Sequence, residues 1–330
     1  MTILKRRNVR DNFDIEPIYS TKYGEMYSGD SKLLLAYLPD ESINLVITSP
    51  PYALLKKKEY GNVNSEGYIR WFRPFAKQIN RILREDGSFV LNIGGAWNKG
   101  QPTRSLYPYE LLLNLVKKEH FYLAQEFFWY NPSKLPAPAQ WVNIERSRVK
   151  DSVEYLWWLS KSPFPKSNNH NILTNYSDSM KKLLEKQSYN HGKRPSGHDI
   201  SKNGWLLDKG GAIPSNVIAS LYEEKQNIIG AANTRSGDEF SSRCREYGRK
   251  LHPARFPTEI PNLFIDFLTE ERDWVLDPFA GSNTTGYASE NKKRNWLSFE
   301  MNEEYAKTSY LRFNKLELGD KNSKEQTELG

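Results

Sequence analysis

The sequence predicts an α/β fold: a doubly wound, mostly parallel sheet with helices on both faces. Short apolar and β-branched runs lack the polar alternation of a sheet that faces water, which is typical of buried parallel strands. Stretches with helical spacing separate these runs, as the connections between parallel strands require. The 330 residues suffice for a sizeable core and, by length, for about two domains.

The first half of the chain alternates between the two patterns. Leu34, Leu35 and Leu38 share one helical face, and residues 43–48 form a continuous buried run. Asp86-Gly87 indicates a turn before the next buried run. The expected elements are helices at 31–38, 68–83 and 106–118 and strands at 43–48, 88–93, 122–130 and 152–160.

The composition changes after Ser160. Residues 161–256 are rich in Asn, Ser, Gly, Pro and Lys, and they carry 16 Lys and Arg against 9 Asp and Glu. Their net charge of +7 equals that of the whole chain, so the remaining residues are balanced. This distribution favours a separate basic module that meets a polyanionic partner.

The α/β pattern resumes after the basic region. The expected elements are a helix at 261–268, a strand at 274–277, a loop at 278–283, a helix to about 291, a strand at 295–299 and a helix from about 303. The predicted organisation is a polar arm at 1–25, an α/β half at 26–160, the basic region at 161–256, a second α/β half at 257–318 and a polar tail at 319–330.

Composition excludes several classes of protein. The single Cys244 can form neither an intramolecular disulfide nor a cysteine zinc site, and the five histidines show no metal-binding spacing. No apolar run approaches the ~18 residues of a membrane span, and no apolar stretch follows the basic N-terminus as in a secretory signal. We therefore expect no metal, no membrane partner and a cytoplasmic, reduced location.

The segment from Asp277 to Thr285 joins a buried strand to a helix through a turn of small residues. Such a turn lets the backbone close on a ligand, and the helix that follows offers unpaired N–H groups. Glu300 ends the next strand, 23 residues on, where an acid can hold the ribose hydroxyls of an adenosine-containing cofactor. An ordinary strand–turn–helix connection is the alternative. The candidate cofactor contacts in the segment are Asp277, Pro278, Phe279, Ala280, Gly281, Ser282 and Thr284.

Asp30 directly precedes the first predicted helix. Its carboxylate could accept a hydrogen bond from the adenine amino group of such a cofactor, or it could cap the helix. The two roles are compatible.

A second turn, Thr48-Ser49-Pro50-Pro51-Tyr52, directly follows a buried strand. Two successive prolines cannot continue a central strand and have no N–H donors, so their carbonyls stay available as acceptors. Such a rigid turn suits a flat ring with an amino group: the Ser49 hydroxyl and the Pro50 carbonyl accept the amino hydrogens, and Tyr52 stacks on the ring. Ser49, Pro50, Pro51 and Tyr52 are therefore the candidate catalytic residues. A proline-rich strand exit is the alternative.

Together these motifs resemble the amino-methyltransferases of DNA restriction–modification systems, whose cofactor is S-adenosyl-L-methionine. The Ser-Pro-Pro-Tyr turn comes first and the Asp-Pro-Phe-Ala-Gly-Ser loop last, an order that resembles the beta group of the family. The similarity is greatest to its PvuII-type cytosine-N4 members and runs from about Thr48 to Glu300, through residues 57–62, 91–95, 131–136, 194–200 and 252–257. Asn283 departs from the glycine common in the family, but Asn tolerates a left-handed backbone.

The resemblance implies a site-specific methyltransferase that modifies cytosine N4 in double-stranded DNA and protects host DNA from a cognate restriction endonuclease. Residues 26–160 would be its catalytic half, 161–256 its target-recognition region and 257–318 its cofactor-binding half. The transfer would be direct, onto a base flipped out of the duplex. By the same resemblance, Pro253 would pack beside the methionine end of the cofactor, and residues 131–136 would line the pocket of the flipped base.

Other activities remain open at this point, and one is excluded. Methylation at cytosine C5 needs a thiolate, and Cys244 lies in the basic region, far in sequence from both loops. Adenine N6 is an alternative target because it also is an amino group on a flat ring, although Ser49 resembles the first catalytic residue of the cytosine-N4 enzymes. A DNA-binding relative without turnover and a methyltransferase for RNA or protein glutamine are the further alternatives.

Basic residues in two regions are candidate DNA contacts. Lys57 and Lys58 follow the catalytic turn and could hold phosphate or form a solvated charge run. The candidates in the basic region are Arg194, His198, Arg235, Arg243 and Arg245, none of which can be assigned to a base. The resemblance alone implies CAGCTG as the recognition sequence and an endonuclease that shares this site without needing to bind the protein. A monomer would suffice for methylating one strand at a time.

Overall fold

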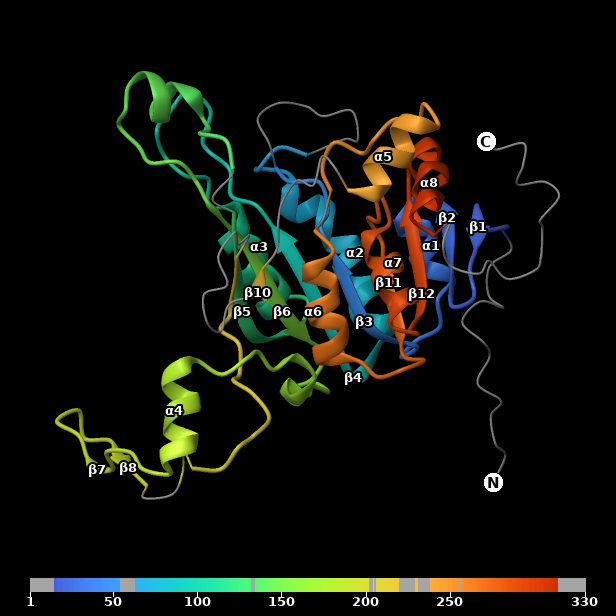
Figure 1. Cartoon of the computed structure of the whole chain (residues 1–330). Helices are drawn as coiled ribbons and strands as arrows, with labels where there is room; N and C mark the ends of the chain where they lie inside the picture. The colour runs from blue at the N-terminus through green and yellow to red at the C-terminus, as the bar shows by residue number, and fades with distance from the viewer. Residues whose placement is uncertain are drawn as a thin grey trace.

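The computed structural model describes residues 15–53, 63–131, 134–201, 204, 206–219, 229–230, 238–255 and 257–313. One large sheet dominates this part of the chain (Figure 1). Its strands are, in spatial order, β1 (Tyr19–Ser20), β2 (Gly24–Ser28), β12 (Asn295–Glu300), β11 (Trp274–Asp277), β3 (Ile43–Thr48), β4 (Leu83–Ile93), β6 (Val153–Ser160), β5 (Tyr122–Tyr130), β9 (Val217–Ala219) and β10 (Ile229–Gly230). The short strands β7 (Gly192–Lys193) and β8 (Asp199–Ile200) pair separately.

The sheet is mostly parallel, as predicted. Strands β2, β12, β11, β3 and β4 run in one direction, whereas β6 lies antiparallel between β4 and β5. Two strands from the end of the sequence, β11 and β12, lie between β2 and β3. The carboxyl ends of β3, β11 and β12 therefore meet at one edge, where doubly wound sheets bind their ligands.

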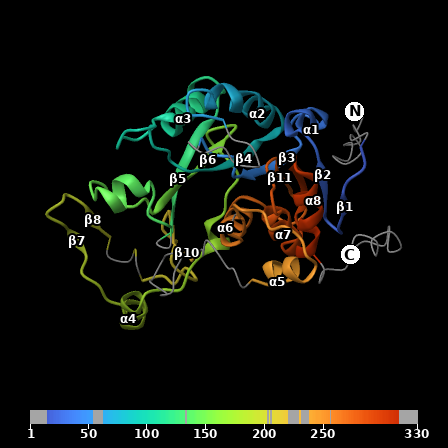
Figure 2. The same ribbon diagram turned by 90° about the horizontal axis from the view of Figure 1, so that it is seen from above.

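Helices cover both faces of the sheet (Figure 2). One face carries α1 (Ser31–Tyr37), α2 (Tyr68–Ile82) and α3 (Tyr107–Lys117), and the other carries α6 (Glu259–Leu268) and α7 (Thr284–Asn291). On this second side also lie α5 (Glu239–Glu246) and α8 (Glu303–Ser309), whereas α4 (Asp178–Lys186) projects away with β7 and β8 (Figures 1 and 2). The fold is therefore doubly wound.

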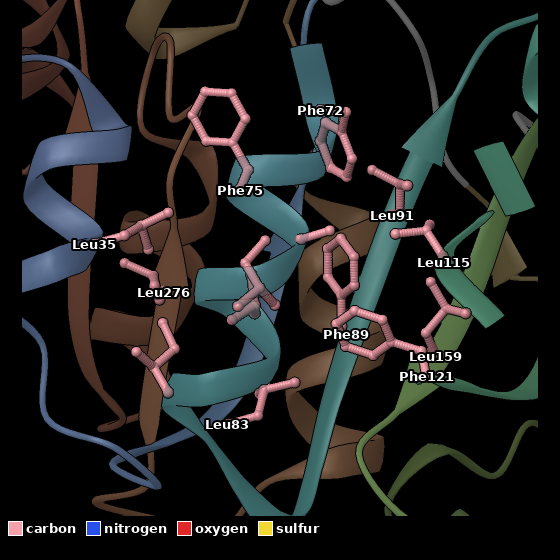
Figure 3. Packing of buried hydrophobic residues seen from close by; sticks show 14 of the residues in the cluster. Leu35, Phe72, Phe75, Leu83, Phe89, Leu91, Leu115, Phe121, Leu159 and Leu276 are labelled. Atoms are coloured by element: carbon pink, nitrogen blue, oxygen red, sulfur yellow. The ribbon is translucent and has the colours of Figure 1, made fainter. Parts of the chain in front are cut away.

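The two-sided cover explains the continuous apolar strands. In β3, Val46 packs in the core beneath α1, α2 and α3, whereas Leu45 packs in the core beneath α6. In the first of these cores, Phe72 of α2 packs with Phe89 and Leu91 of β4 (Figure 3). Burying each such side chain stabilises the fold by roughly 1.5–3 kcal/mol.

The N-terminal arm is shorter than predicted. Residues 19–28 form β1 and β2 at the edge of the sheet, and Tyr19 is buried with its hydroxyl 2.6 Å from Ser309 Oγ. The prediction of a polar arm at 1–25 is thus wrong for residues 19–25. The buried side chains of this strand pair include Tyr19, Tyr23 and Met26 rather than an aliphatic run, so the hydrophobic pattern did not reveal it. Residues 1–14 lie outside the described part.

The predicted turn at Asp86-Gly87 is an irregularity inside a strand. β4 begins at Leu83, and its register with β3 shifts between the pairs Ile43–Leu83 and Leu45–Ser88. A Cβ on Gly87 would lie 2.9 Å from the Arg84 carbonyl oxygen, so the bulge needs glycine there.

The basic region 161–256 is not a detached module. β9 pairs with β5 of the main sheet, and α5 lies against residues 310–312. In contrast, α4 and the β7–β8 pair stand away from the core (Figure 1). The composition of the region could not reveal its sheet pairing, because β9 is only three residues long. Its part in target recognition stays a prediction.

Candidate active site

The two loops singled out in the sequence lie side by side. β11 pairs with β3, with Leu276 opposite Val46. At the ends of these strands, the Thr48 hydroxyl donates to Oδ1 of Asp277 over 2.6 Å, across 229 residues of sequence. The two loops therefore begin next to each other, at the carboxyl ends of neighbouring strands.

Asp277 anchors the loop that follows it. Oδ1 also accepts from the Phe279 N–H at 3.0 Å, and Oδ2 accepts from the Thr285 hydroxyl at 2.7 Å. Burial raises the pKa of Asp277 to about 6, against the effect of these hydrogen bonds, which favour the ionised form. Because both oxygens have partners inside the protein, Asp277 would serve a cofactor by holding the loop in shape.

The loop then packs down between helices of the first face. The Ser31 hydroxyl, at the start of α1, donates to the carbonyl of Pro278. The ring of Phe279 lies against Phe75 of α2, with 4.9 Å between the ring centroids. Three further candidates of the loop, Ala280, Ser282 and Thr284, are buried.

Gly281 turns the loop toward the end of β12. Its φ of +53° lies in the left-handed region that side chains disfavour, and its N–H donates to Oε2 of Glu300 at 2.9 Å. A Cβ here would lie 3.3 Å from the ring of His252. The site therefore has a tight backbone turn between a carboxylate and an imidazole.

Asn283 also adopts the left-handed conformation, with φ +52° and ψ +45°. Its side-chain oxygen accepts from the Gly286 N–H at 3.0 Å and from the Ser298 hydroxyl at 2.7 Å, and its amide donates to the Tyr19 hydroxyl at 2.9 Å. The expectation that Asn tolerates this backbone is confirmed. The side chain also caps α7 and ties it to β12 and β1, which glycine could not do.

Two carboxylates lie at adjacent strand ends beside the loop. β2 pairs with β12, and the Gly29 N–H donates to the Glu300 carbonyl at 3.0 Å. Oε1 of Glu300 accepts from the Asn302 N–H at 2.9 Å, and burial raises the pKa of Glu300. Asp30 accepts from the Lys32 N–H at 2.9 Å, so its helix-capping role is confirmed, and its cofactor contact stays a prediction.

Two side chains reach this loop that were not among the predicted site residues. The ring of His252 packs edge-on against Tyr305 at 4.7 Å between centroids, and burial lowers the pKa of His252. Half-buried Arg312 donates to the carbonyl oxygen and the hydroxyl of Ser282, at 2.5 and 2.9 Å. His252 directly precedes Pro253, which was predicted and is exposed, so the resemblance of residues 252–257 could have identified it. No sequence pattern identified Arg312.

The loop has features that a ligand would complete. Within the described residues, the buried hydroxyl of Thr284 has no hydrogen-bond partner. An unpaired buried polar group costs about 1–3 kcal/mol, which a polar group of a ligand would recover. Gly281 allows the tight left-handed turn that brings the loop against Glu300 and His252. The donor and acceptor set therefore fits a polar, adenosine-bearing cofactor.

The turn at residues 49–52 is fixed by β4 and α2. The Ser49 hydroxyl donates to Oδ1 of Asn92 at 3.2 Å and lies 3.1 Å from the Tyr52 hydroxyl. The Tyr68 hydroxyl donates to the carbonyl of Pro51 at 2.9 Å, and Pro50 is buried. The turn is thus rigid, as the two prolines predicted.

Tyr52 is held more tightly than the sequence suggested. Its hydroxyl lies 2.7 Å from Oδ1 of Asn92 and 2.9 Å from Oε2 of Glu154, and a Cβ on Gly94 would lie 2.6 Å from its ring. Burial, and next the charge of Glu154, raise the pKa of Tyr52, so its hydroxyl stays protonated. Asn92 and Gly94 belong to residues 91–95, one of the segments similar to the cytosine-N4 methyltransferases. No sequence pattern identified Glu154 as part of the site. Stacking of Tyr52 on a base stays a prediction.

The predicted DNA contacts lie in different settings. Lys57, Lys58 and Arg235 fall outside the described residues. Arg194 and His198 lie at the β7–β8 turn, and Arg245 is exposed on α5. Arg243 is largely covered: it donates to the Leu311 carbonyl and to Glu239, both at 2.8 Å. Its geometry favours attachment of α5 to the C-terminal segment over contact with DNA.

Neither a metal-binding cluster nor a membrane-spanning helix is present among the described residues. No cluster of three or more His, Cys, Asp or Glu side chains there could hold a metal ion. No helix in the same residues combines the length and the apolar character needed to span a bilayer.

Known proteins match this architecture over nearly the whole chain. Residues 43–311 match the DNA methylase family. The chain is 48% identical over 304 residues to the type II methyltransferase M.PvuII of Proteus hauseri, covering 92% of this chain and 87% of that protein. It is 26% identical over 290 residues to M.ScaI of Streptomyces caespitosus, covering 88% and 81%.

The structural comparison agrees with the sequence comparison. The solved structure titled PvuII DNA methyltransferase (cytosine-N4-specific) superposes with a TM-score of 0.73 at 40% identity, over 96% of this chain and 94% of that one. The family match spans the turn at residues 49–52, here called the acceptor turn, the loop at residues 277–285, here called the cofactor loop, and Glu300. The hydrogen bond between Thr48 and Asp277 joins the acceptor turn to the cofactor loop. The chain therefore belongs to the DNA methylase family, as the resemblance of its motifs predicted.

Proposed function

We propose that this protein transfers a methyl group from S-adenosylmethionine to the N4 amino group of cytosine in double-stranded DNA. The similarity to a cytosine-N4-specific enzyme over nearly the whole chain supports this target. The observation that carries the proposal is the contact between Thr48 and Asp277, because it joins the acceptor turn and the cofactor loop in one site. Direct transfer requires the two reacting groups to meet in such a site.

S-Adenosylmethionine supplies a methyl group on a sulfonium, whose sulfur is a good leaving group. The carboxylates of Glu300 and Asp30 would accept hydrogen bonds from its hydroxyl and amino groups, since each oxygen retains acceptor capacity. The tight turn at Gly281 would set the shape of the loop around it, and the unpaired Thr284 hydroxyl would gain a partner. Pro253 would pack at its methionine end, as the resemblance implies.

The residues of the turn would prepare the base for attack. The cytosine amino nitrogen is a weak nucleophile because its lone pair is conjugated with the ring. When its two hydrogens are donated to Ser49 Oγ and the Pro50 carbonyl, the nitrogen becomes pyramidal and the lone pair is released toward the methyl group. Because a paired base cannot reach this turn, flipping of the base out of the duplex is part of the proposal.

Several finer features of the function remain predictions. Arg194, His198 and Arg245, with Lys57, Lys58 and Arg235 outside the described residues, are the proposed DNA contacts. The recognition sequence CAGCTG, the protection of host DNA from a cognate endonuclease, the monomeric state and the cytoplasmic location are also predictions. They draw support from the resemblance to restriction–modification methyltransferases and from the basic region.

Mass spectrometry of nucleosides tests the proposal directly. DNA from cells that express the protein should contain N4-methylcytosine, and N6-methyladenine in its place would move the target to adenine. If purified protein transfers no labelled methyl group from the cofactor to any duplex, the alternative of a DNA-binding relative without turnover prevails.

A variant of Ser49 tests the assigned role of the turn. Ser49→Ala should lower the turnover number by about 100-fold, because a hydrogen-bond acceptor that acts in the transition state is lost. The cofactor Kd should change less than about twofold, because Ser49 faces the acceptor side. Ser20→Ala, at an exposed serine in β1, is the matched control. Equal losses in turnover and cofactor affinity would contradict the role given to Ser49.

A further inference from the structure

The carboxylate of Glu154 lies behind the acceptor turn and has no role in the chemistry proposed above. Glu154, at the start of β6, is only 12% exposed, and its Oε2 lies 2.9 Å from the Tyr52 hydroxyl. Its other oxygen, Oε1, accepts from Lys134 Nζ at 3.0 Å. Burying a charge costs folding free energy unless the charge is paired, so the burial of this carboxylate beside Tyr52 calls for an explanation.

The Tyr52 hydroxyl can donate its proton to either of two acceptors. One is Oδ1 of Asn92 at 2.7 Å and the other is Oε2 of Glu154 at 2.9 Å. The orientation of Asn92 is fixed, because its amide donates to the Tyr155 carbonyl at 3.1 Å. Hydrogen bonds to an ionised acceptor are roughly twice as strong as neutral ones, so the proton favours Glu154.

This choice determines what Ser49 can do. When Tyr52 donates to Glu154, the Ser49 proton can go to Asn92 Oδ1 at 3.2 Å or to the Tyr52 oxygen at 3.1 Å. In either case the lone pairs of Ser49 remain for an incoming amino group. Without the carboxylate, Tyr52 would compete with Ser49 for Asn92, and Ser49 would lose its fixed direction.

We propose that Glu154 is a positioning residue that makes Ser49 a hydrogen-bond acceptor and receives, through Tyr52, the proton that the methylated amino group releases. The inference rests on the proposed function. Once the S–C bond breaks and the N–C bond forms, the nitrogen is positively charged. Its N–H proton passes to Ser49, the Ser49 proton to the Tyr52 oxygen, and the Tyr52 proton to Glu154. One N–H bond is lost, one O–H bond forms on Glu154, and both hydroxyls are restored.

The surroundings of Glu154 suit this route. Lys134 balances the charge of the carboxylate from the chain after β5, and Tyr107 of α3 faces it, its own pKa raised first by burial and then by the charge of Glu154. Arg104, whose charge acts to lower the pKa of Tyr107, forms an ion pair with Asp151. The exposed part of Glu154 gives the proton a way out to water after each turnover.

The first test replaces the carboxylate with its neutral isostere. Glu154→Gln should lower the single-turnover rate of methyl transfer to unmethylated plasmid DNA by at least about tenfold, because Ser49 loses its fixed direction as an acceptor. Kd values for cofactor and DNA should stay within about threefold. Glu126→Gln, at an exposed carboxyl in β5, is the matched control and should keep wild-type rates.

A double-mutant cycle shows whether Glu154 acts through Tyr52. Tyr52→Phe should lower the rate by a similar factor, and adding Glu154→Gln to it should cost less than about twofold more. Additive losses, cofactor or DNA Kd values that weaken as much as the rate falls, or a Glu154→Gln rate within twofold of wild type would overturn the proposal. If Glu154→Gln does not fold, Tyr52→Phe decides alone, and a rate within twofold of wild type would overturn the proposal. Wild-type protein that methylates no DNA refutes the proposed function, whereas active wild type with unchanged variants refutes only the role of Glu154.

Discussion

Replacing Asp277 with Asn should make the protein more stable at neutral pH. The carboxyl group is only 4% exposed, and burial raises its pKa to about 6 from the ordinary 3.8. The folded protein therefore binds this proton more tightly than the unfolded chain does. The stability that the proton confers is fully present below pH 3.8 and is lost as the pH rises through about 6.

The size of the effect follows from the two pKa values. Their difference corresponds to about 3 kcal/mol of unfolding free energy, of which about 2 kcal/mol remains at about pH 4.5 and almost none at about pH 7.5. Asn preserves the acceptor for Thr48 and for the Phe279 N–H, and its amide can donate to the Thr285 hydroxyl. Rearranging that one hydrogen bond costs about 1 kcal/mol. The net gain of the variant at about pH 7.5 is thus about 2 kcal/mol.

Urea unfolding followed by tryptophan fluorescence measures this difference, and the nine tryptophans supply the signal. Between about pH 4.5 and 7.5, the free energy of unfolding of Asp277→Asn relative to wild type should rise by about 2 kcal/mol. The control variant Glu126→Gln removes an exposed carboxyl and should shift by less than about 0.5 kcal/mol. A difference that does not depend on pH, or a wild type more stable than Asp277→Asn at neutral pH, would refute the burial argument.

Two further substitutions test the packing of the site, and a third tests the attachment of the β1–β2 edge. Gly94→Ala should displace the Tyr52 ring, which would lie 2.6 Å from the new methyl group, and lower the methylation rate at least about tenfold with cofactor Kd unchanged in equilibrium titration. Gly281→Ala should weaken cofactor binding about tenfold in the same titration, because φ +53° costs a side chain about 1–2 kcal/mol and His252 is 3.3 Å away. Glu290→Ala should lower the urea-unfolding free energy by about 3 kcal/mol, because it leaves the buried Tyr23 N–H and Trp296 Nε1–H unpaired and the Thr21 hydroxyl with only the Gly24 carbonyl. A loss below about 1 kcal/mol would contradict this.

Elements with strong periodicity were predicted well. The strands at 43–48 and 122–130 have the predicted bounds, and the helix predicted at 68–83 spans Tyr68–Ile82. The helix carries its own signal because its buried side chains recur on one face, and residues 43–48 carry theirs as a nearly continuous buried run. The β1–β2 pair and β9 were missed, since their burial comes from partners distant in the sequence.

The candidate site was predicted in part. Its two loops carry recognisable residue types, so Ser49, Tyr52 and Gly281 could be named from the sequence. Arg312 and Glu154 could not, because a single charged residue in a helix or strand usually faces solvent and only the fold places these two behind the loops. Conversely, Arg243 was predicted to be a DNA contact, but its side chain is largely covered and donates to the Leu311 carbonyl.

The sequence by itself determined the alternation of strands and helices, the rigid proline turn and the small-residue loop, because these depend on backbone chemistry and on periodicity within about ten residues. Only the tertiary structure decided that Thr48 meets Asp277 and that Tyr52 meets Glu154. The physical reason is that strand order in a sheet is set by which apolar faces are buried together, and this order brings together chain segments that no local pattern relates.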